Sequence, residues 1–154
     1  MLFNNPNDTE ADATRVGFIG DNLNSAVAPQ NDVDLYRFEL LADGTVTVDA
    51  IPDPGLDVAI RLFDSLGNEL VSVDAAGTDS AEQLVHAVTT AGTYYVGISR
   101  SANVNYSALD GSGAVGGSST GSYRMDIRFS EPVPVDDDNS SFDTATPIGP
   151  LGVG

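Results

Sequence analysis

The chain has 154 residues and carries 23 acidic side chains against six basic ones, which gives a formal net charge of −17. Its length is that of one ordinary domain, and a hydrophobic content of 41 % is enough to supply a core. So negative a surface repels nucleic acid and anionic membranes. It favours cations as partners, above all Ca²⁺, although an acidic surface that serves only solubility is the alternative explanation.

The sequence contains no cysteine, which excludes disulfides, thiolate metal sites and thiol nucleophiles. No run approaches the roughly 18 apolar residues of a membrane span, so we expect no membrane insertion. Residues 1–6 lack a basic region followed by an apolar one, so no secretory signal is visible. Either the protein is not secreted by that route, or the sequence is an excerpt to which a start methionine was added.

Alternation of apolar and polar residues, rather than helical periodicity, dominates the chain. In chain order, the predicted strands are residues 34–40, 45–50, 58–63, 69–73, 83–89, 93–99 and 122–129. Turn residues separate the strands, and a long polar loop precedes the last one, which is typical of an all-β sandwich. The alternation predicts a core built from Tyr36, Phe38, Val46, Val48, Ile60, Leu62, Val96, Ile98, Tyr123, Met125 and Ile127.

The pattern of strands stops before residues 131–135, whose prolines indicate a linker. Beyond this linker, residues 139–149 echo residues 7–17, with Asn, Ala, Thr and Gly recurring at matching positions. This predicts a sandwich over residues 1–130, followed by residues 136–154 as the start of a second repeat or as an assembly tail. Chance similarity between two acidic, turn-rich stretches is the alternative.

Oxygen-bearing side chains gather in two short segments that precede predicted strands. They are Asn5, Asn7 and Asp8 in the first segment, and Asn31, Asp32 and Asp34 in the second. Residues two apart in extended chain share a face, so the two segments could converge on Ca²⁺, which takes six to eight oxygen ligands. The spacing is not that of an EF-hand loop, and Asn and Asp also dominate ordinary turns, so both explanations stay open. Asp79, an acid in another loop, is expected to play no comparable part.

Several blocks of sequence, in the same order, resemble the bacterial pre-peptidase C-terminal domain. They are residues 7–14, 32–38, 62–70, 91–98, 111–113 and 119–125. The resemblance spans about residues 5–129 and extends to the related collagen-binding domains of clostridial collagenases. It implies a jelly-roll-like antiparallel β-sandwich that serves as an accessory module of a secreted or cell-surface protein. Such modules often follow peptidases and often occur in tandem.

The resemblance also implies a calcium ion held between the N-terminal segment and the acidic stretch before the strand at residues 34–40. Three residues fall on ligand positions of the collagen-binding relatives: Asn7, Asp8 and Asp34. Asn5 and Asn31 fall on positions that are acidic in those relatives, and Asp32 is adjacent to one of them and can substitute. These departures lower the negative charge of the implied site.

Catalytic chemistry finds little support in the sequence. His86 is the only histidine, lies inside a predicted strand, and has no second His or Cys with which to build a triad or a zinc site. The glycine-rich stretch at residues 111–117 is not followed by the Lys or helix start of a phosphate loop. Tyr106, in the long loop, either packs that loop down or is an exposed aromatic for gripping a polysaccharide or peptide.

We therefore expect a non-catalytic, calcium-binding accessory module that acts outside the cell or on its surface in spacing, adhesion or substrate targeting. The expected partners are a neighbouring domain, an identical subunit, or an extracellular protein or polysaccharide. The alternative function is a structural subunit of a surface polymer or filament. In that case the tail at residues 136–154 would dock on a neighbouring copy, for example by adding a strand to a sheet edge.

Overall fold

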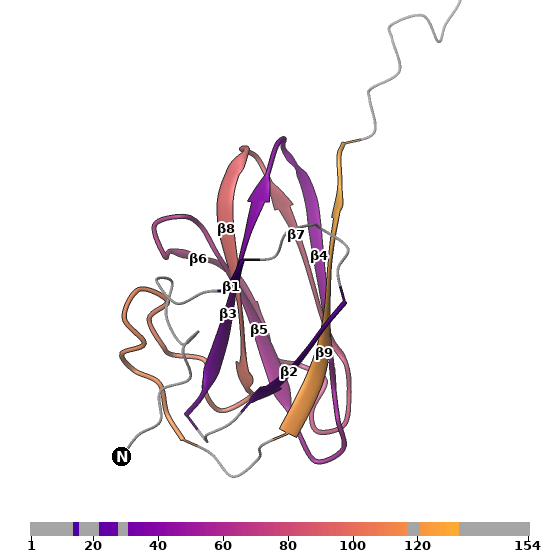
Figure 1. Ribbon diagram of the computed structural model, residues 1–154, viewed down its shortest axis with the longest axis vertical. Helices are drawn as coiled ribbons and strands as arrows, with labels where there is room; N and C mark the ends of the chain where they lie inside the picture. The colour runs from indigo at the N-terminus through magenta and orange to yellow at the C-terminus, as the bar shows by residue number, and fades with distance from the viewer. Residues whose placement is uncertain (1–13, 16–21, 28–30, 117–120, 133–154) are drawn as a thin grey trace, which may run out of the picture.

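Two β-sheets pack face to face in the computed structural model, which describes residues 14–15, 22–27, 31–116 and 121–132 (Figure 1). The strands are β1 (Thr14–Arg15), β2 (Asn22–Val27), β3 (Val33–Leu40), β4 (Gly44–Pro52), β5 (Val58–Phe63), β6 (Glu69–Val73), β7 (Glu82–Val88), β8 (Gly92–Arg100) and β9 (Gly121–Ser130). All seven strands predicted from alternation are present. The all-β sandwich is thus confirmed, and β1 and β2 add two strands that the sequence did not reveal.

The sheet orders bring distant segments together. One sheet runs β1-β3-β8-β5-β6 and the other β2-β9-β4-β7. Among the described strands, every pairing is antiparallel except that of β1 with β3, which is parallel through Thr14 and Tyr36. The expected antiparallel β-sandwich is confirmed, and the short β1 adds one parallel pair at the edge of a sheet. A parallel neighbour needs a long connection, and the chain passes through β2 in the other sheet before it reaches β3.

The core lies between the two sheets, where the inward side chains of the alternating strands meet. All eleven predicted core residues are buried in it, and Leu56, Val58, Leu84 and Tyr94 join them. On β4 the burial alternates at each residue, because its outer face meets solvent. On β5 every side chain is buried, which requires cover on the outer face of its sheet as well.

That cover is the loop at residues 101–116, which packs a second apolar cluster against the five-stranded sheet. The cluster consists of Val33, Leu35, Phe63, Tyr95, Tyr106 and Ala108. Tyr106 is 1 % exposed, so it packs the loop down and is not an exposed aromatic. Its hydroxyl occupies the space above Gly97, where an added Cβ would lie 2.1 Å from the Tyr106 oxygen. Glycine at position 97 is what lets the ring reach the sheet.

The described residues contain no helix, and hence none of the length and apolar character that crossing a membrane would require. The linker and tail expected at residues 131–135 and 136–154 lie almost wholly outside the described residues, which end at residue 132.

Candidate functional site

Two buried carboxylates lie where the chain enters β3. Asp32 is 1 % exposed and Asp34 is fully buried. Asp34 pairs with Ile98 of β8 and is in phase with the inward side chains of Tyr36 and Phe38, so it faces the space between the sheets. The sequence predicted both acids as ligands, and the fold places them at the same end of the sandwich.

Asp34 accepts a hydrogen bond from a tyrosine on the opposite sheet. The Tyr123 hydroxyl of β9 donates to Asp34 Oδ2 at 2.7 Å, and the Tyr36 hydroxyl lies 2.6 Å from the Tyr123 oxygen. Because Tyr123 has one hydroxyl hydrogen and gives it to Asp34, Tyr36 must donate to Tyr123. Burial, and then the negative charge of Asp34, raises the pKa of Tyr123 well above its ordinary value. The proton therefore stays on Tyr123, and the chain of hydroxyls fixes the orientation of the Asp34 carboxylate.

Asn103, a fully buried residue of the covering loop, holds the segment before β3 from the other side. Its side-chain NH₂ group donates to the backbone oxygens of Asn31 and Asp32, each at 3.3 Å. Its Oδ1 accepts from the backbone N–H of Val115 at 2.8 Å. One amide thus ties the two ends of the loop at residues 101–116 to the acidic segment.

Arg100, the last residue of β8, lies at the same end. The β3–β8 register pairs Val33 with Ser99, so the next positions outward are Asp32 and Arg100. Arg100 is 2 % exposed, yet its Nε, Nη1 and Nη2 atoms are buried without a hydrogen-bond partner. Burial lowers the pKa of this guanidinium, and the charge of Asp32 partly restores it.

Of the six predicted ligands, the structure describes Asn31, Asp32 and Asp34, which lie where the chain enters β3. The other three, Asn5, Asn7 and Asp8, lie outside the described residues. Within the described ranges, no three His, Cys, Asp or Glu side chains come close enough to hold a metal ion. The donor set that is described has the oxygen chemistry that calcium prefers, but it supplies two carboxylates where six to eight oxygens are needed.

Sequence reasoning missed three side chains that surround the acidic segment at this end. Tyr123 was predicted as core, but its bond to Asp34 joins residues 89 positions apart and depends on how the two sheets face each other. Asn103 lies in a polar loop where Asn is ordinary. Arg100 continues the inward phase of Val96 and Ile98, which is the one signal that could have drawn attention to it.

Asp79 has a structural role in its loop. Its carboxylate accepts from the Gly55 N–H at 2.5 Å, and its own N–H donates to Leu56 O at 3.1 Å. Its φ is +66°, a left-handed conformation that Asp tolerates better than most residues. The loop acid Asp43, which is exposed, is therefore the better control for substitutions.

Two further features lie on the four-stranded sheet. His86 is half-buried on the edge strand β7, opposite Val46, as a packed or edge histidine would be. The outer face carries a groove of about 330 Å³ lined by Asp49, Ile51, Ala81, Arg124, Asp126 and Arg128. Arg128 pairs with Asp49 and with Asp126 there, so part of its charge is neutralised.

The comparisons with known proteins agree with this architecture. Residues 32–100 match the family model of the bacterial pre-peptidase C-terminal domain. These residues are similar to such a domain. They run from Asp32 to Arg100, so the pre-peptidase C-terminal match begins and ends at the two residues that face each other across β3 and β8. No curated protein matches the sequence.

Three solved structures have been compared with this chain. The pre-peptidase C-terminal domain of a Bacillus anthracis collagenase has a TM-score of 0.55 and 14 % identity, covering 75 % of this chain and 94 % of its own. The surface-associated copper-binding protein CorA of Methylomicrobium album has a TM-score of 0.50 and 10 % identity, covering 77 % and 98 %. A periplasmic inhibitor of g-type lysozyme from Aeromonas hydrophila reaches 0.47 and 14 %, covering 77 % and 96 %. At such identities the likeness is one of fold.

Proposed function

We propose that the chain is a non-catalytic, calcium-binding accessory module of a secreted or cell-surface protein. The pre-peptidase C-terminal domain is a non-catalytic accessory type, and the observation that carries the calcium proposal is the burial of both Asp32 and Asp34 where the chain enters β3. Two neighbouring buried carboxylates repel each other and lose their hydration, so they need positive charge close by. Ca²⁺ supplies two units of charge and accepts carboxylate oxygens readily.

The arrangement around Asp34 supports this proposal. Carboxylates that bind metals are commonly hydrogen-bonded on their other oxygen, which fixes their orientation. Tyr123 and Tyr36 act in that way on Asp34 Oδ2. The remaining oxygen ligands would come from Asn5, Asn7 and Asp8 of the N-terminal segment. A calcium ion shared by that segment and the start of β3 would fasten the N-terminal segment to the sandwich.

Thermal unfolding with calcium and with chelator tests the proposal. A ligand that binds only the folded state stabilises it by about 2.7 kcal/mol at a hundredfold excess over Kd. We expect a higher melting temperature in millimolar CaCl₂ and its reversal by EDTA. Melting curves that superimpose in the two conditions would rule the calcium site out.

Substitution of Asp34 separates a bound ion from general screening of charge. Asp34→Asn keeps an oxygen that accepts from Tyr123 but removes the ligand charge, so we expect a folded protein with no calcium response. Asp43→Asn removes the same charge from an exposed loop and should keep the full response. If both variants respond alike, calcium acts by screening the −17 net charge and not at a site.

A role in spacing, adhesion or substrate targeting outside the cell is proposed with the module. It is supported by the match to an accessory domain of a collagenase and by the acidic surface, which suits an environment rich in divalent cations. Binding of the intact protein to immobilised extracellular proteins and polysaccharides, with Asp34→Asn for comparison, tests the targeting role.

One observation favours the structural subunit as a second candidate. The N-terminal stretch that the tail echoes includes Thr14–Arg15, which is β1, the edge strand of the five-stranded sheet (Figure 1). A tail with the same pattern, at residues 139–149, suits strand addition at that edge in a second copy. Deleting residues 136–154 should then leave a folded monomer and abolish assembly in sedimentation velocity runs. Assembly that persists after the deletion would contradict this candidate.

A further inference from the structure

The outer edge of β7 presents a row of backbone groups that the described fold leaves unpaired. β7 (Glu82–Val88) closes the four-stranded sheet and has β4 as its neighbour on one side. The two strands stay in register through seven consecutive residue pairs, without a bulge. Among the described residues, no backbone hydrogen bond beyond this pairing reaches residues 83–88. An edge of this kind can accept a further strand.

The two edges of the five-stranded sheet are protected against strand addition. β1 is two residues long, and β6 pairs with β5 through a bulge and carries the ion-paired Glu69. Short strands, bulges and charged side chains are the usual means of blunting an edge. β7 contains neither lysine nor proline, and its one acid, Glu82, is 2 % exposed and accepts from backbone N–H groups of the preceding loop. β7 therefore lacks the protection that β1 and β6 have.

The side chains around this edge carry no net charge. Gln83, Val85 and Ala87 lie on the outer face and are exposed, Val85 to 55 %. On the described strands of the same face, the charged side chains are those of the groove, in which two arginines balance two aspartates. In a chain with a net charge of −17, two copies thus meet little repulsion from the groups at this contact.

We propose that β7 pairs antiparallel with β7 of a second copy across a two-fold axis at Val85, so that two four-stranded sheets join into one continuous sheet. Val85 is the middle residue of the strand, so all seven residues take part. Val85 then lies opposite Val85, and Gln83 opposite Ala87 of the second copy. No like charges face each other, and a pair of β-branched residues is favourable in an antiparallel sheet. The contact involves neither calcium nor residues 136–154.

The size of the contact determines its strength. Stable interfaces bury on the order of 1,200–2,000 Å² in total, and a single pair of edge strands gives a smaller contact, so the dimer forms at high protein concentration. Salt strengthens it, because screening reduces the repulsion between two acidic copies. A two-fold contact closes on itself and stops at a dimer, whereas addition of a tail to the next copy continues to longer assemblies. The mass of the assembly separates the two.

Disulfide crosslinking tests the register, because the chain has no cysteine of its own. Val85→Cys places two thiols opposite each other, with Cα atoms about 4.5–5.5 Å apart, which a disulfide can span. Ile51→Cys is the control, since Ile51 is 40 % exposed on the outer face of β4 and is not on the edge. We expect Val85→Cys to form covalent dimers at least tenfold faster than Ile51→Cys. A mixture of Gln83→Cys and Ala87→Cys should crosslink faster than either variant alone. Equal rates for Val85→Cys and Ile51→Cys would overturn the inference.

Sedimentation equilibrium between about 10 μM and 1 mM protein, in about 0.3 M NaCl, tests the contact without a covalent bond. We expect the wild type and Ile51→Lys to shift from monomer toward dimer over this range. Val85→Lys should stay monomeric, because two lysines would face each other at the axis. Circular dichroism checks that both lysine variants are folded. A wild type that is monomeric at about 1 mM, or a dimer that persists in Val85→Lys, would contradict the proposed pairing.

Discussion

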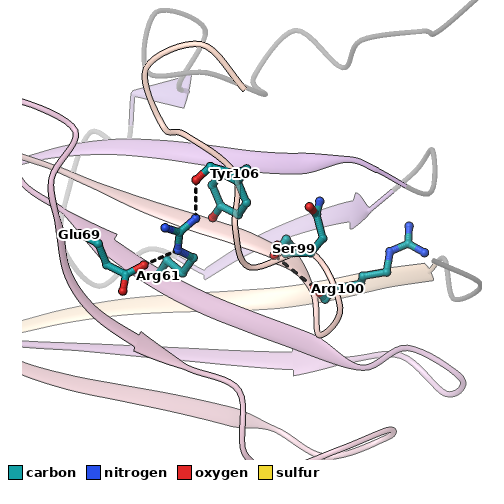
Figure 2. A network of polar contacts seen from close by, with 6 residues as sticks. Arg61, Glu69, Ser99, Arg100 and Tyr106 are labelled. Carbon is teal, nitrogen blue, oxygen red and sulfur yellow. Dashed lines mark hydrogen bonds and ion pairs between the residues drawn. The ribbon is translucent and has the colours of Figure 1, made fainter. Parts of the chain in front are cut away.

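Two buried arginines on neighbouring strands of the five-stranded sheet differ in the contacts that their guanidinium groups make. Arg61 of β5 and Arg100 of β8 are 8 % and 2 % exposed, and by strand alternation they face opposite sides of the five-stranded sheet. Figure 2 shows Arg61 bonded to Glu69 and Tyr106, with Arg100 lying apart from them. Arg61 donates through Nε to Glu69 at 2.5 Å and through Nη1 to Tyr106 O at 2.7 Å. Its guanidinium also lies over the rings of Phe63 and Tyr106, 4.7 and 4.3 Å from their centres. Arg100 makes none of these contacts.

The contribution of a buried charge to stability depends on the groups that surround it. Arg61 has a carboxylate, a carbonyl and two aromatic faces around it, so its charge is used within the fold and holds the covering loop to the sheet. Arg100 is desolvated at the inner face without such contacts, so its burial costs free energy that the fold does not recover through hydrogen bonds. The same type of side chain thus stabilises the fold on one face of the sheet and contributes little to stability on the other.

Substitution of Tyr106, which packs against Arg61, should have the largest effect on the free energy of unfolding. Tyr106→Ala removes a buried ring from the loop cluster and one aromatic face from Arg61, and we expect a loss of about 3–5 kcal/mol of unfolding free energy. Tyr106→Phe removes only a hydroxyl that has no hydrogen-bond partner, so it should change stability by less than about 1 kcal/mol. Urea unfolding of both variants measures the difference. Equal losses would mean that the hydroxyl, and not the ring, holds the loop.

Substitution of Arg61 itself should cause the second largest loss of unfolding free energy. Arg61→Met leaves the carbonyl of Tyr106 without its donor inside the protein, while Glu69, which is 41 % exposed, can turn to water. We expect a loss of about 2–3 kcal/mol in urea unfolding, from one broken charged hydrogen bond and one stranded acceptor. A change below about 0.5 kcal/mol would show that the contacts around Arg61 carry little stability, and the contrast with Arg100 would fail.

At high pH, the stability of the folded state should depend on Tyr123, which lies at the same end of the sandwich as Arg100. Because the pKa of Tyr123 is raised in the folded state, the unfolded chain releases this proton first, near pH 10, and the folded state loses stability as the pH rises. The loss is at most about 1.4 kcal/mol per pH unit from this residue. Tyr123→Phe should therefore show a shallower decline between pH 10 and 11 than the wild type. The pKa of Tyr106 is raised as well, so part of the decline remains in the variant.

Alternation predicted the sandwich well because strands such as β4 and β9 bury one face and expose the other. Their large apolar residues recur at every second position, and burial of those residues decides the fold. β2, with the sequence Asn-Leu-Asn-Ser-Ala-Val, has no such pattern and is held by its pairing with β9. β1 is two residues long, and its parallel pairing with β3 depends on the path of the chain and not on local sequence.

The candidate site was predictable only in part, for a physical reason. Asp32 and Asp34 stood out because they adjoin a strand whose inward residues were evident. The residues that hydrogen-bond to them come from elsewhere in the chain. Tyr123 lies 89 residues from Asp34, and Asn103 lies 71 residues from Asp32. Such contacts follow from how strands are ordered within and between sheets, which a linear pattern does not encode.

The smallest effect on stability is expected from Arg100. Arg100→Met removes a buried guanidinium whose nitrogens lack hydrogen-bond acceptors, which is favourable, and removes a positive charge that acts on Asp32, which is unfavourable. The two changes oppose each other, so the unfolding free energy should stay within about 1 kcal/mol of the wild type, well below the loss in Arg61→Met. Urea unfolding of both variants under one condition measures this contrast. A loss of 2 kcal/mol or more in Arg100→Met, on the scale of a broken buried polar contact, would mean that Arg100 is a fastener like Arg61 and would remove the distinction between the two faces of the sheet.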